Sequence, residues 1–258
     1  MPIKMIVTDL DRTLLRADKT VSKFTTDTLN RCREKGIKIV FATARSENSC
    51  RRFVEMITPD AIISNGGALV RSQQKEIYRA SMNIDTTNRL LMALVNNQSV
   101  GCITVDTEKG YFINRLIDVN DPGWIDYFPN AYNDFSNGID YESYKIAAET
   151  SDNKVIYELE TGFATVNVIP FTGENWFCIA DKSAVKWSGI CALSTYMEID
   201  ISDIVAFGDD YNDIEMLRGC GIGVAVSNAI SEAKDAANHI CDTNENDGVA
   251  KWLEENVL

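Results

Sequence analysis

Five short, almost entirely apolar runs divide the chain into strands alternating with helices. They are Met5–Thr8, Ile37–Ala42, Ala61–Ile63, Ile204–Phe207 and Ile222–Val226. Apolar runs of this length are typical of strands that are buried on both faces of a parallel sheet. Segments with helical character lie between them, namely Thr25–Lys35, Ser46–Met56 and Ala184–Met197. The alternation predicts an α/β fold with a doubly wound, Rossmann-like parallel sheet.

The alternation breaks in the middle of the chain. A predicted helix at Asp85–Asn97 is followed by strand-like segments at Gly101–Val105, Tyr111–Asn114, Lys145–Glu149, Thr165–Ile169 and Trp176–Ala180. Turn residues occur at Asp121-Pro122-Gly123 and at Asn137-Gly138. We therefore predict an α+β domain over residues 82–181, inserted between the two parts of the core at 1–81 and 182–258.

The composition narrows the functions that this fold could have. The 258 residues include 25 Lys plus Arg against 38 Asp plus Glu, a net charge of −13. This acidic excess argues against nucleic acid as a partner, because phosphates require a basic surface. The chain has one histidine, His239, so a His-rich metal site is excluded. Any proton transfer is expected to use carboxylates.

The cysteines and the hydrophobic runs indicate the cell compartment. The seven cysteines include no C-x-x-C pair, which predicts reduced thiols in a cytoplasmic protein. Asp9 interrupts the first apolar run, so no signal peptide is expected. No stretch approaches the roughly 20 apolar residues of a membrane span, and no membrane partner is expected.

Two acidic clusters follow apolar runs that we predict to be strands. Asp9 and Asp11 end the first run, and two residues separated by two positions on a strand point the same way. The segment Gly208–Asp213, with three more acids and Asn212, follows the run at Ile204–Phe207. Ligands of open parallel sheets bind outside the carboxyl ends of the strands. Carboxylates that repel each other there are usually held by a divalent cation.

Two further residues are weaker signals when each is taken alone. Thr43 follows the second apolar run and opens a predicted helix, where free N–H groups could bind phosphate. A simple N-cap is the alternative reading for a hydroxyl at this position. Lys186 begins another predicted helix, and a single lysine is normally a solvated charge.

Together these stretches resemble the motifs of the haloacid dehalogenase superfamily. The pattern D-x-D-x-T lies at Asp9–Thr13, and G-D-x-x-N-D lies at Gly208–Asp213, with Thr43 and Lys186 between them in the family order. The chain is also similar to the Cof-type branch, at Ser64–Gly67, Asp213–Leu217, Ser227–Ala229 and Asp247–Ala250. The insert resembles the large α+β (C2-type) cap of that branch in position and size.

The resemblance implies a role for each matching residue. Asp9 would be the nucleophile that forms an aspartyl-phosphate, and Asp11 would be the general acid. Mg²⁺ would be held by the carboxylates of Asp9 and Asp209 and by the backbone carbonyl of Asp11. Contacts to phosphate or substrate are expected from Leu10, Thr43, Ala44, Arg45, Lys186 and Asn212. Supporting roles are expected for Asp210, Asp213, Asn65 and Gly66.

Three residues depart from the family pattern. Arg12, Ala44 and Trp187 stand where the family usually has glycine. If the backbone is left-handed at any of them, the Cβ atom costs about 1–2 kcal/mol. Arg12 also brings a positive charge next to the nucleophile, which makes it a candidate for steering anions.

The sequence therefore predicts a Mg²⁺-dependent phosphatase of small phosphorylated metabolites, such as sugar phosphates. Two alternatives stay open at this point. One is a phosphomutase on the same fold, and the other is a regulator that binds phosphate or metal without catalysis. The sequence names neither the substrate nor the oligomeric state.

Overall fold

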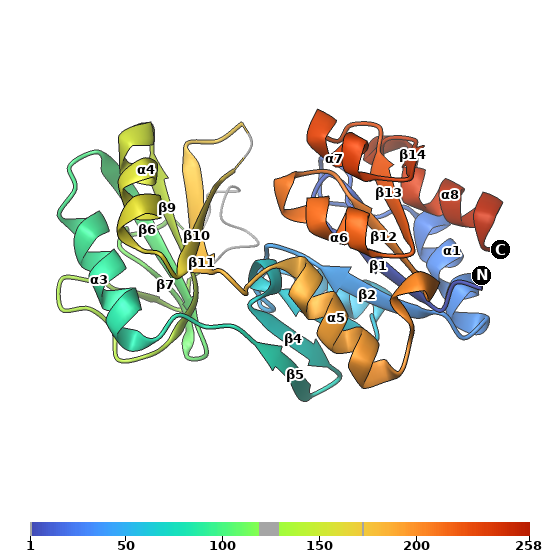
Figure 1. Cartoon of the computed structure of the whole chain (residues 1–258), viewed down its shortest axis with the longest axis horizontal. Helices are drawn as coiled ribbons and strands as arrows, with labels where there is room; N and C mark the ends of the chain where they lie inside the picture. The colour runs from blue at the N-terminus through green and yellow to red at the C-terminus, as the bar shows by residue number, and fades with distance from the viewer. Residues whose placement is uncertain (1, 119–128, 172) are drawn as a thin grey trace. The chain divides into compact units, whose positions relative to one another are not determined.

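The computed structural model describes residues 2–118, 129–171 and 173–258 and divides into two compact units. The core unit comprises Met1–Glu47, Arg51–Tyr78 and Val185–Leu258, and the insert unit comprises Arg79–Ala184 with Asn48–Cys50. The turn expected at Asp121-Pro122-Gly123 lies outside the described residues. Figure 1 shows the elements of each unit.

The core unit contains one mixed, mostly parallel sheet. Within the described residues its strand order is β14-β13-β12-β1-β2-β3-β4-β5. Their bounds are β1 (Met5–Thr8), β2 (Lys38–Ala42), β3 (Ala61–Ser64), β4 (Leu69–Ser72), β5 (Lys75–Arg79), β12 (Ile204–Gly208), β13 (Ile222–Val226) and β14 (His239–Cys241). All five predicted runs are strands, and β1, β2, β3, β12 and β13 pair in parallel. The antiparallel strand β4 and its neighbour β5 were not predicted.

Helices cover both faces of the core sheet. They are α1 (Lys23–Glu34), α2 (Arg51–Ile57), α5 (Lys186–Met197), α6 (Ile214–Gly219), α7 (Ser231–Ala236) and α8 (Gly248–Asn256). Met5 and Val7 of β1 share one apolar cluster with Ile190 and Leu193 of α5. On the other face, the ring of Phe207 in β12 meets Trp252 of α8 edge-on, with 5.5 Å between centroids. The predicted doubly wound fold is confirmed.

One predicted helix begins later than expected. The sequence pattern predicts a helix over Ser46–Met56, but α2 begins at Arg51. The backbone carbonyls of Thr43 and Arg45 accept hydrogen bonds from Gly66 and Asn65, at 2.9 and 2.8 Å. These bonds tie the loop after β2 to the turn at Asn65 and Gly66, and Thr43 lies in this loop rather than at the start of a helix. The prediction that Thr43 lies at a helix N-terminus, where free N–H groups could bind phosphate, is therefore wrong.

The insert unit is a sheet with helices packed on one face. Its described strands run β10-β11-β9-β6-β7-β8, with bounds β6 (Val100–Thr107), β7 (Gly110–Ile113), β8 (Ala131–Tyr132), β9 (Ser143–Thr150), β10 (Val166–Pro170) and β11 (Trp176–Asp181). The helices α3 (Ile84–Val95) and α4 (Asn153–Gly162) pack against it through one apolar cluster. The predicted helix and five strands are present, whereas α4 and β8 were not predicted.

Two further expectations concern membranes and thiols. No helix in the described part of the chain is both long and apolar enough to cross a membrane. All seven cysteines are free thiols.

The packing of α5 on the sheet can be tested by truncating Ile190, which is fully buried in the core cluster. We expect Ile190→Ala to lower the free energy of unfolding by about 2–5 kcal/mol, because a cavity replaces packed atoms. Urea denaturation measures the change. Thr195→Ala on the exposed side of the same helix should cost less than about 0.5 kcal/mol. Equal losses in the two variants would contradict this packing.

Candidate active site

A buried lysine joins two of the predicted carboxylates. Lys186, the first residue of α5, donates from Nζ to Asp9 Oδ1 and to Asp213 Oδ1, both at 2.6 Å. The Lys186 and Asp213 side chains are fully buried, and that of Asp9 is 9% exposed. Residues separated by 177 positions in the chain therefore meet at one point of the core unit.

Asp213 also organises the loop that follows β12. Its Oδ2 accepts the backbone N–H groups of Asp209 at 2.9 Å and Asp210 at 3.1 Å. Asp210 in turn caps the short 3₁₀ helix Tyr211–Asp213. Because both oxygens of Asp213 already accept hydrogen bonds, this residue positions Lys186 and the loop more readily than it could bind a ligand.

Asp209 is held from two sides. Its Oδ1 accepts the hydroxyl of Thr13 at 2.9 Å, and its Oδ2 faces Arg12 Nε at 3.6 Å. The Asp209 side chain is almost fully buried. The sequence interpretation assigned Thr13 no role, although the threonine of the D-x-D-x-T pattern was the available signal.

Burial and charge shift the pKa values of these groups strongly. Burial, with the nearby carboxylate of Asp213, raises the pKa of Asp209 to about 7. Burial also raises the pKa of Asp9, although Lys186 opposes the change. For Lys186 the attraction of Asp213 and Asp9 outweighs burial, so its pKa is raised and the side chain stays charged.

The oxygen atoms of this cluster suit a hard divalent cation. Asp9, Asp209 and Asp213 each offer a carboxylate oxygen, and these oxygens lie within 4.8 Å of one another. Carboxylate oxygens are the ligands that Mg²⁺ prefers. Asp9 and Asp209 each use one oxygen in a hydrogen bond with a side chain of the described residues, so both could offer the other oxygen to a cation. The donor set therefore fits Mg²⁺.

Asp11 is paired with two cations. Arg45 donates from Nε to Asp11 Oδ2 at 2.6 Å and from Nη2 to Oδ1 at 2.8 Å, and Lys19 Nζ donates to Oδ1 at 2.7 Å. Burial alone would raise the pKa of Asp11, but these hydrogen bonds lower it to about 2. Asp11 is therefore ionised in this arrangement. Lys19 was not predicted, because no motif marks a lysine eight residues after Asp11.

The loop that carries Thr43 is bonded to the turn at Asn65–Gly67. Thr43 Oγ1 accepts the backbone N–H of Arg45 at 3.1 Å, so the hydroxyl is already near a backbone donor. Asn65 and Gly66 bind the carbonyls of this loop through their own N–H groups. Arg45 is buried and stacks over the ring of Phe53 at 5.2 Å.

The same turn also touches the start of α5. Asn65, Gly66 and Gly67 have φ values of 51°, 72° and 115°, which are left-handed. A Cβ atom at Gly67 would lie 2.2 Å from the carbonyl carbon of Val185, so only glycine fits there. The turn thus fixes Thr43 and Arg45 relative to Lys186.

The remaining predicted residues lie on the loops of the core unit. Leu10 is fully buried, and its carbonyl accepts the N–H of Leu15 at 2.8 Å. Ala44 is half-buried between Thr43 and Arg45, and Asn212 is half-buried in the 3₁₀ helix after β12.

The three positions that depart from the family pattern differ in backbone conformation. Arg12 has a left-handed φ of 61° and carries the expected strain of about 1–2 kcal/mol. Ala44 does not have a positive φ, and Trp187 is an ordinary residue of α5. The Cβ atom is therefore costly only at Arg12.

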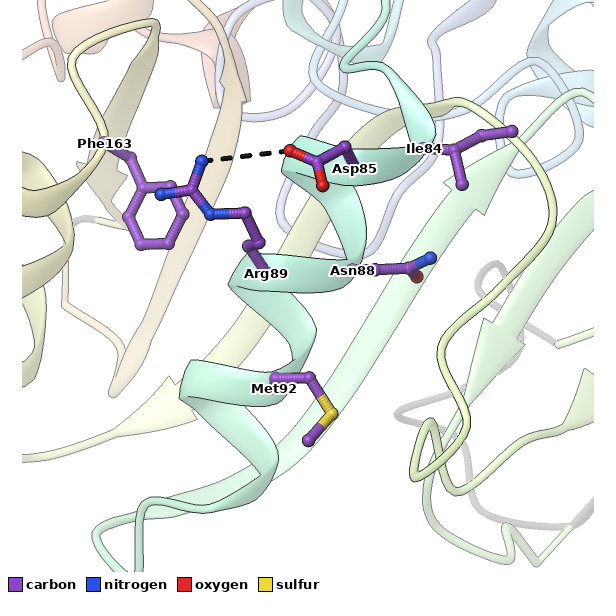
Figure 2. A pocket seen from close by; sticks show the side chains of 6 residues that line it. All are labelled: Ile84, Asp85, Asn88, Arg89, Met92 and Phe163. Carbon is purple, nitrogen blue, oxygen red and sulfur yellow. Dashed lines mark ion pairs between the residues drawn. The ribbon is translucent and has the colours of Figure 1, made fainter.

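A pocket on the insert unit lacks a comparable cluster of carboxylates. Figure 2 shows its lining residues, among them Asp85 and Arg89, which form an ion pair at 3.8 Å. Phe163 lies under the Arg89 guanidinium, 5.2 Å away. Asp85 is the one carboxylate among the described lining residues, so no second acid is available there for metal binding.

Comparisons with known proteins cover almost the whole chain. A sequence model of the haloacid dehalogenase-like hydrolases matches residues 6–253. The 5-amino-6-(5-phospho-D-ribitylamino)uracil phosphatase YitU of Bacillus subtilis (strain 168) is 29% identical, over 97% of this chain and 96% of that protein. YbjI of Escherichia coli (strain K12), which is also named a 5-amino-6-(5-phospho-D-ribitylamino)uracil phosphatase, is 26% identical, over 99% of this chain and 96% of that protein. The crystal structure of a haloacid dehalogenase-like hydrolase from Bacteroides thetaiotaomicron has a TM-score of 0.85 at 25% identity, covering 98% of this chain and 99% of that chain.

The charge of Lys186 can be removed without much change in size. We expect Lys186→Met to lower the free energy of unfolding by about 3–5 kcal/mol, because it leaves Asp9 and Asp213 buried without a cation. Chemical denaturation at pH 7 measures the effect. Lys38→Met, which breaks the half-exposed pair with Asp60, should cost only about 0–1 kcal/mol. A Lys186 variant as stable as the Lys38 variant would contradict the role of this buried pair.

Metal binding should depend on pH through Asp209. Its pKa is raised to about 7, so the carboxyl group is largely protonated at lower pH and must lose the proton to bind Mg²⁺. Below pH 7 the apparent Mg²⁺ affinity should fall by at least about tenfold per pH unit, because the raised pKa of Asp9, the other proposed carboxylate ligand, adds to the effect of Asp209. Isothermal titration calorimetry at several pH values measures this. An affinity that is constant from about pH 5 to pH 8 would contradict the prediction.

Proposed function

Because the chain belongs to the haloacid dehalogenase-like hydrolase family, we propose that it is a Mg²⁺-dependent phosphatase of small phosphorylated metabolites. Relatives such as YitU and YbjI are named phosphatases, and the predicted family and enzyme class, a phosphatase, are confirmed. The observation that carries the finer proposal is the buried contact of Lys186 with Asp9 and Asp213, next to Asp209.

Asp9 is proposed as the nucleophile. One carboxylate oxygen of Asp9 would attack phosphorus and form an aspartyl-phosphate, and Lys186, which donates to Oδ1, would keep the carboxylate oriented. When bound, Mg²⁺ would neutralise charge on the phosphate and so reduce its repulsion from the carboxylates. Asp9, Asp209 and the backbone carbonyl of Asp11 are proposed to hold it.

Asp11 is proposed to move the protons. In the ionised form that Arg45 and Lys19 favour, it can act as the base that activates water against the aspartyl-phosphate. Protonation of the leaving oxygen requires a proton on Asp11, and its low pKa opposes this. An arriving phosphate that attracts Arg45 and Lys19 away from Asp11 would raise that pKa, so both roles become available in sequence.

Several groups around Asp9 could bind the phosphate oxygens. Lys186 supplies a buried positive charge, and Thr43 Oγ1 lies in the loop next to Arg45. We propose that Leu10, Ala44, Arg45 and Asn212 complete the contacts to phosphate or substrate. Asp210, Asp213, Asn65 and Gly66 are proposed to position these groups.

The substrate is proposed to be small and phosphorylated. YitU and YbjI are named for a phosphorylated ribitylamino compound, which supports a substrate of this size and polarity. We propose that residues 82–181 form the inserted cap domain that selects it. The seven free thiols support a cytoplasmic location.

The proposal is tested by phosphate release from a panel of phosphorylated sugars and nucleotides. With Mg²⁺ we expect turnover of at least one compound, and Asp9→Asn should reduce kcat by at least about 10³-fold, because the amide cannot act as the nucleophile. Asp60→Asn, which changes a carboxylate of the core unit that pairs with the half-exposed Lys38, serves as the matched control. EDTA should abolish the activity.

Three results would contradict the proposal. They are no release from any compound, full activity of Asp9→Asn, and full activity in EDTA. An isomerised sugar phosphate without free phosphate would instead identify a phosphomutase. Binding of Mg²⁺ and phosphate without turnover would identify a regulator.

A further inference from the structure

Arg12 combines an unusual backbone with a charge close to the nucleophile. Its φ of 61° lies in the left-handed region, which a residue with a Cβ atom rarely adopts. Glycine would adopt it without strain. The backbone conformation alone would therefore favour glycine over arginine at this position.

The backbone at Arg12 is fixed by a loop from another part of the core unit. Asn228 Nδ2 donates to the Arg12 carbonyl at 2.8 Å, and Arg12 Nη2 donates to the Asn228 carbonyl at 3.5 Å. Asn228 also accepts the backbone N–H of Asn244 at 3.0 Å, which fixes its own side chain. These bonds limit the positions that the guanidinium can reach.

The guanidinium faces one particular oxygen of Asp209. Arg12 Nε lies 3.6 Å from Asp209 Oδ2, whereas Thr13 already occupies Oδ1. The two partners differ in exposure, because the side chain of Arg12 is 50% exposed and that of Asp209 is 4% exposed. Arg12 can therefore turn toward water more easily than Asp209 can.

We propose that Arg12 competes with the divalent cation for Asp209 and thereby lowers the Mg²⁺ affinity of this chain. The inference rests on the metal site of the proposed function. A cation bound to Asp209 Oδ2 would share that oxygen with the guanidinium, and two positive charges this close repel each other. Arg12 therefore has to withdraw toward solvent when Mg²⁺ binds, and the binding equilibrium carries that cost.

The test separates the charge of residue 12 from its backbone strain. Arg12→Gln removes the charge and Arg12→Lys keeps it, and both replacements are unbranched at Cβ, so the left-handed strain is similar. In calorimetric titration with MgCl₂ and no substrate, Arg12→Gln should bind Mg²⁺ about threefold to fivefold more tightly than the unmodified chain. Arg12→Lys should bind with nearly unchanged affinity. The gain should shrink at high KCl, because the guanidinium is exposed enough to be screened.

Two further variants serve as controls for the loss of a charge elsewhere and for backbone strain at residue 12. Lys23→Gln removes an exposed charge that pairs with Asp27 on the surface of α1, so it should leave the Mg²⁺ affinity unchanged. Arg12→Gly relieves the strained backbone as it removes the charge, and it should also bind Mg²⁺ more tightly. This variant keeps the test valid if Arg12→Gln folds poorly.

The outcomes distinguish this inference from the proposed function. Unchanged affinity in Arg12→Gln and Arg12→Gly, or an equal gain in Arg12→Lys, would overturn the competition. Absence of Mg²⁺ binding in every variant would overturn it together with the metal site. Tighter binding in the two neutral variants, with no phosphatase activity in any protein, would support the competition and overturn the proposed activity.

Discussion

Three carboxylates lie close together in the core unit where water cannot screen them. Oxygens of Asp9, Asp209 and Asp213 are within 4.8 Å of one another, and all three residues are buried. Such an arrangement is stable only if positive charge is supplied at short range or a carboxyl group keeps its proton. The ammonium of Lys186, at 2.6 Å from two of them, supplies it. The rest of the site is arranged around keeping that lysine in place.

The position of Lys186 depends on backbone contacts that carry no charge. Lys186 begins α5, and the residue before it, Val185, lies against Gly67 too closely for any Cβ atom. The same left-handed turn binds the carbonyls of Thr43 and Arg45. The backbone of this turn, through the close approach of Gly67 to Val185, thus sets the spacing between Lys186 and the loop after β2.

The sequence predicted the parts of the site that depend on periodicity and motif. Buried strands are recognisable as apolar runs, so the loops after β1 and β12 could be assigned to one edge of a sheet from the residues alone. Lys19 and the late start of α2 could not be predicted, because both depend on contacts between distant segments. Lys19 reaches Asp11 from a turn with no motif, and the loop before α2 is bonded to residues 65 and 66, which the sequence pattern does not reveal. Because the family usually has glycine at the position of Arg12, a strained left-handed backbone was considered there. The φ of 61° shows that the backbone is left-handed at Arg12.

The charge balance of the site differs from that of the whole chain. The chain carries −13, but in the site Asp9 and Asp213 face Lys186, while Asp11 and Asp209 face cations of their own. Four carboxylates are matched by four cations, Lys186, Arg45, Lys19 and Arg12, so the ionised site is formally neutral at these residues. A phosphate dianion entering this balanced group would add two negative charges in a partly buried place. In the proposed function one divalent cation would offset them, so a site that is formally neutral without metal is still expected to need Mg²⁺ for phosphoryl transfer. The acidic surplus of the chain lies elsewhere and contributes nothing to this requirement.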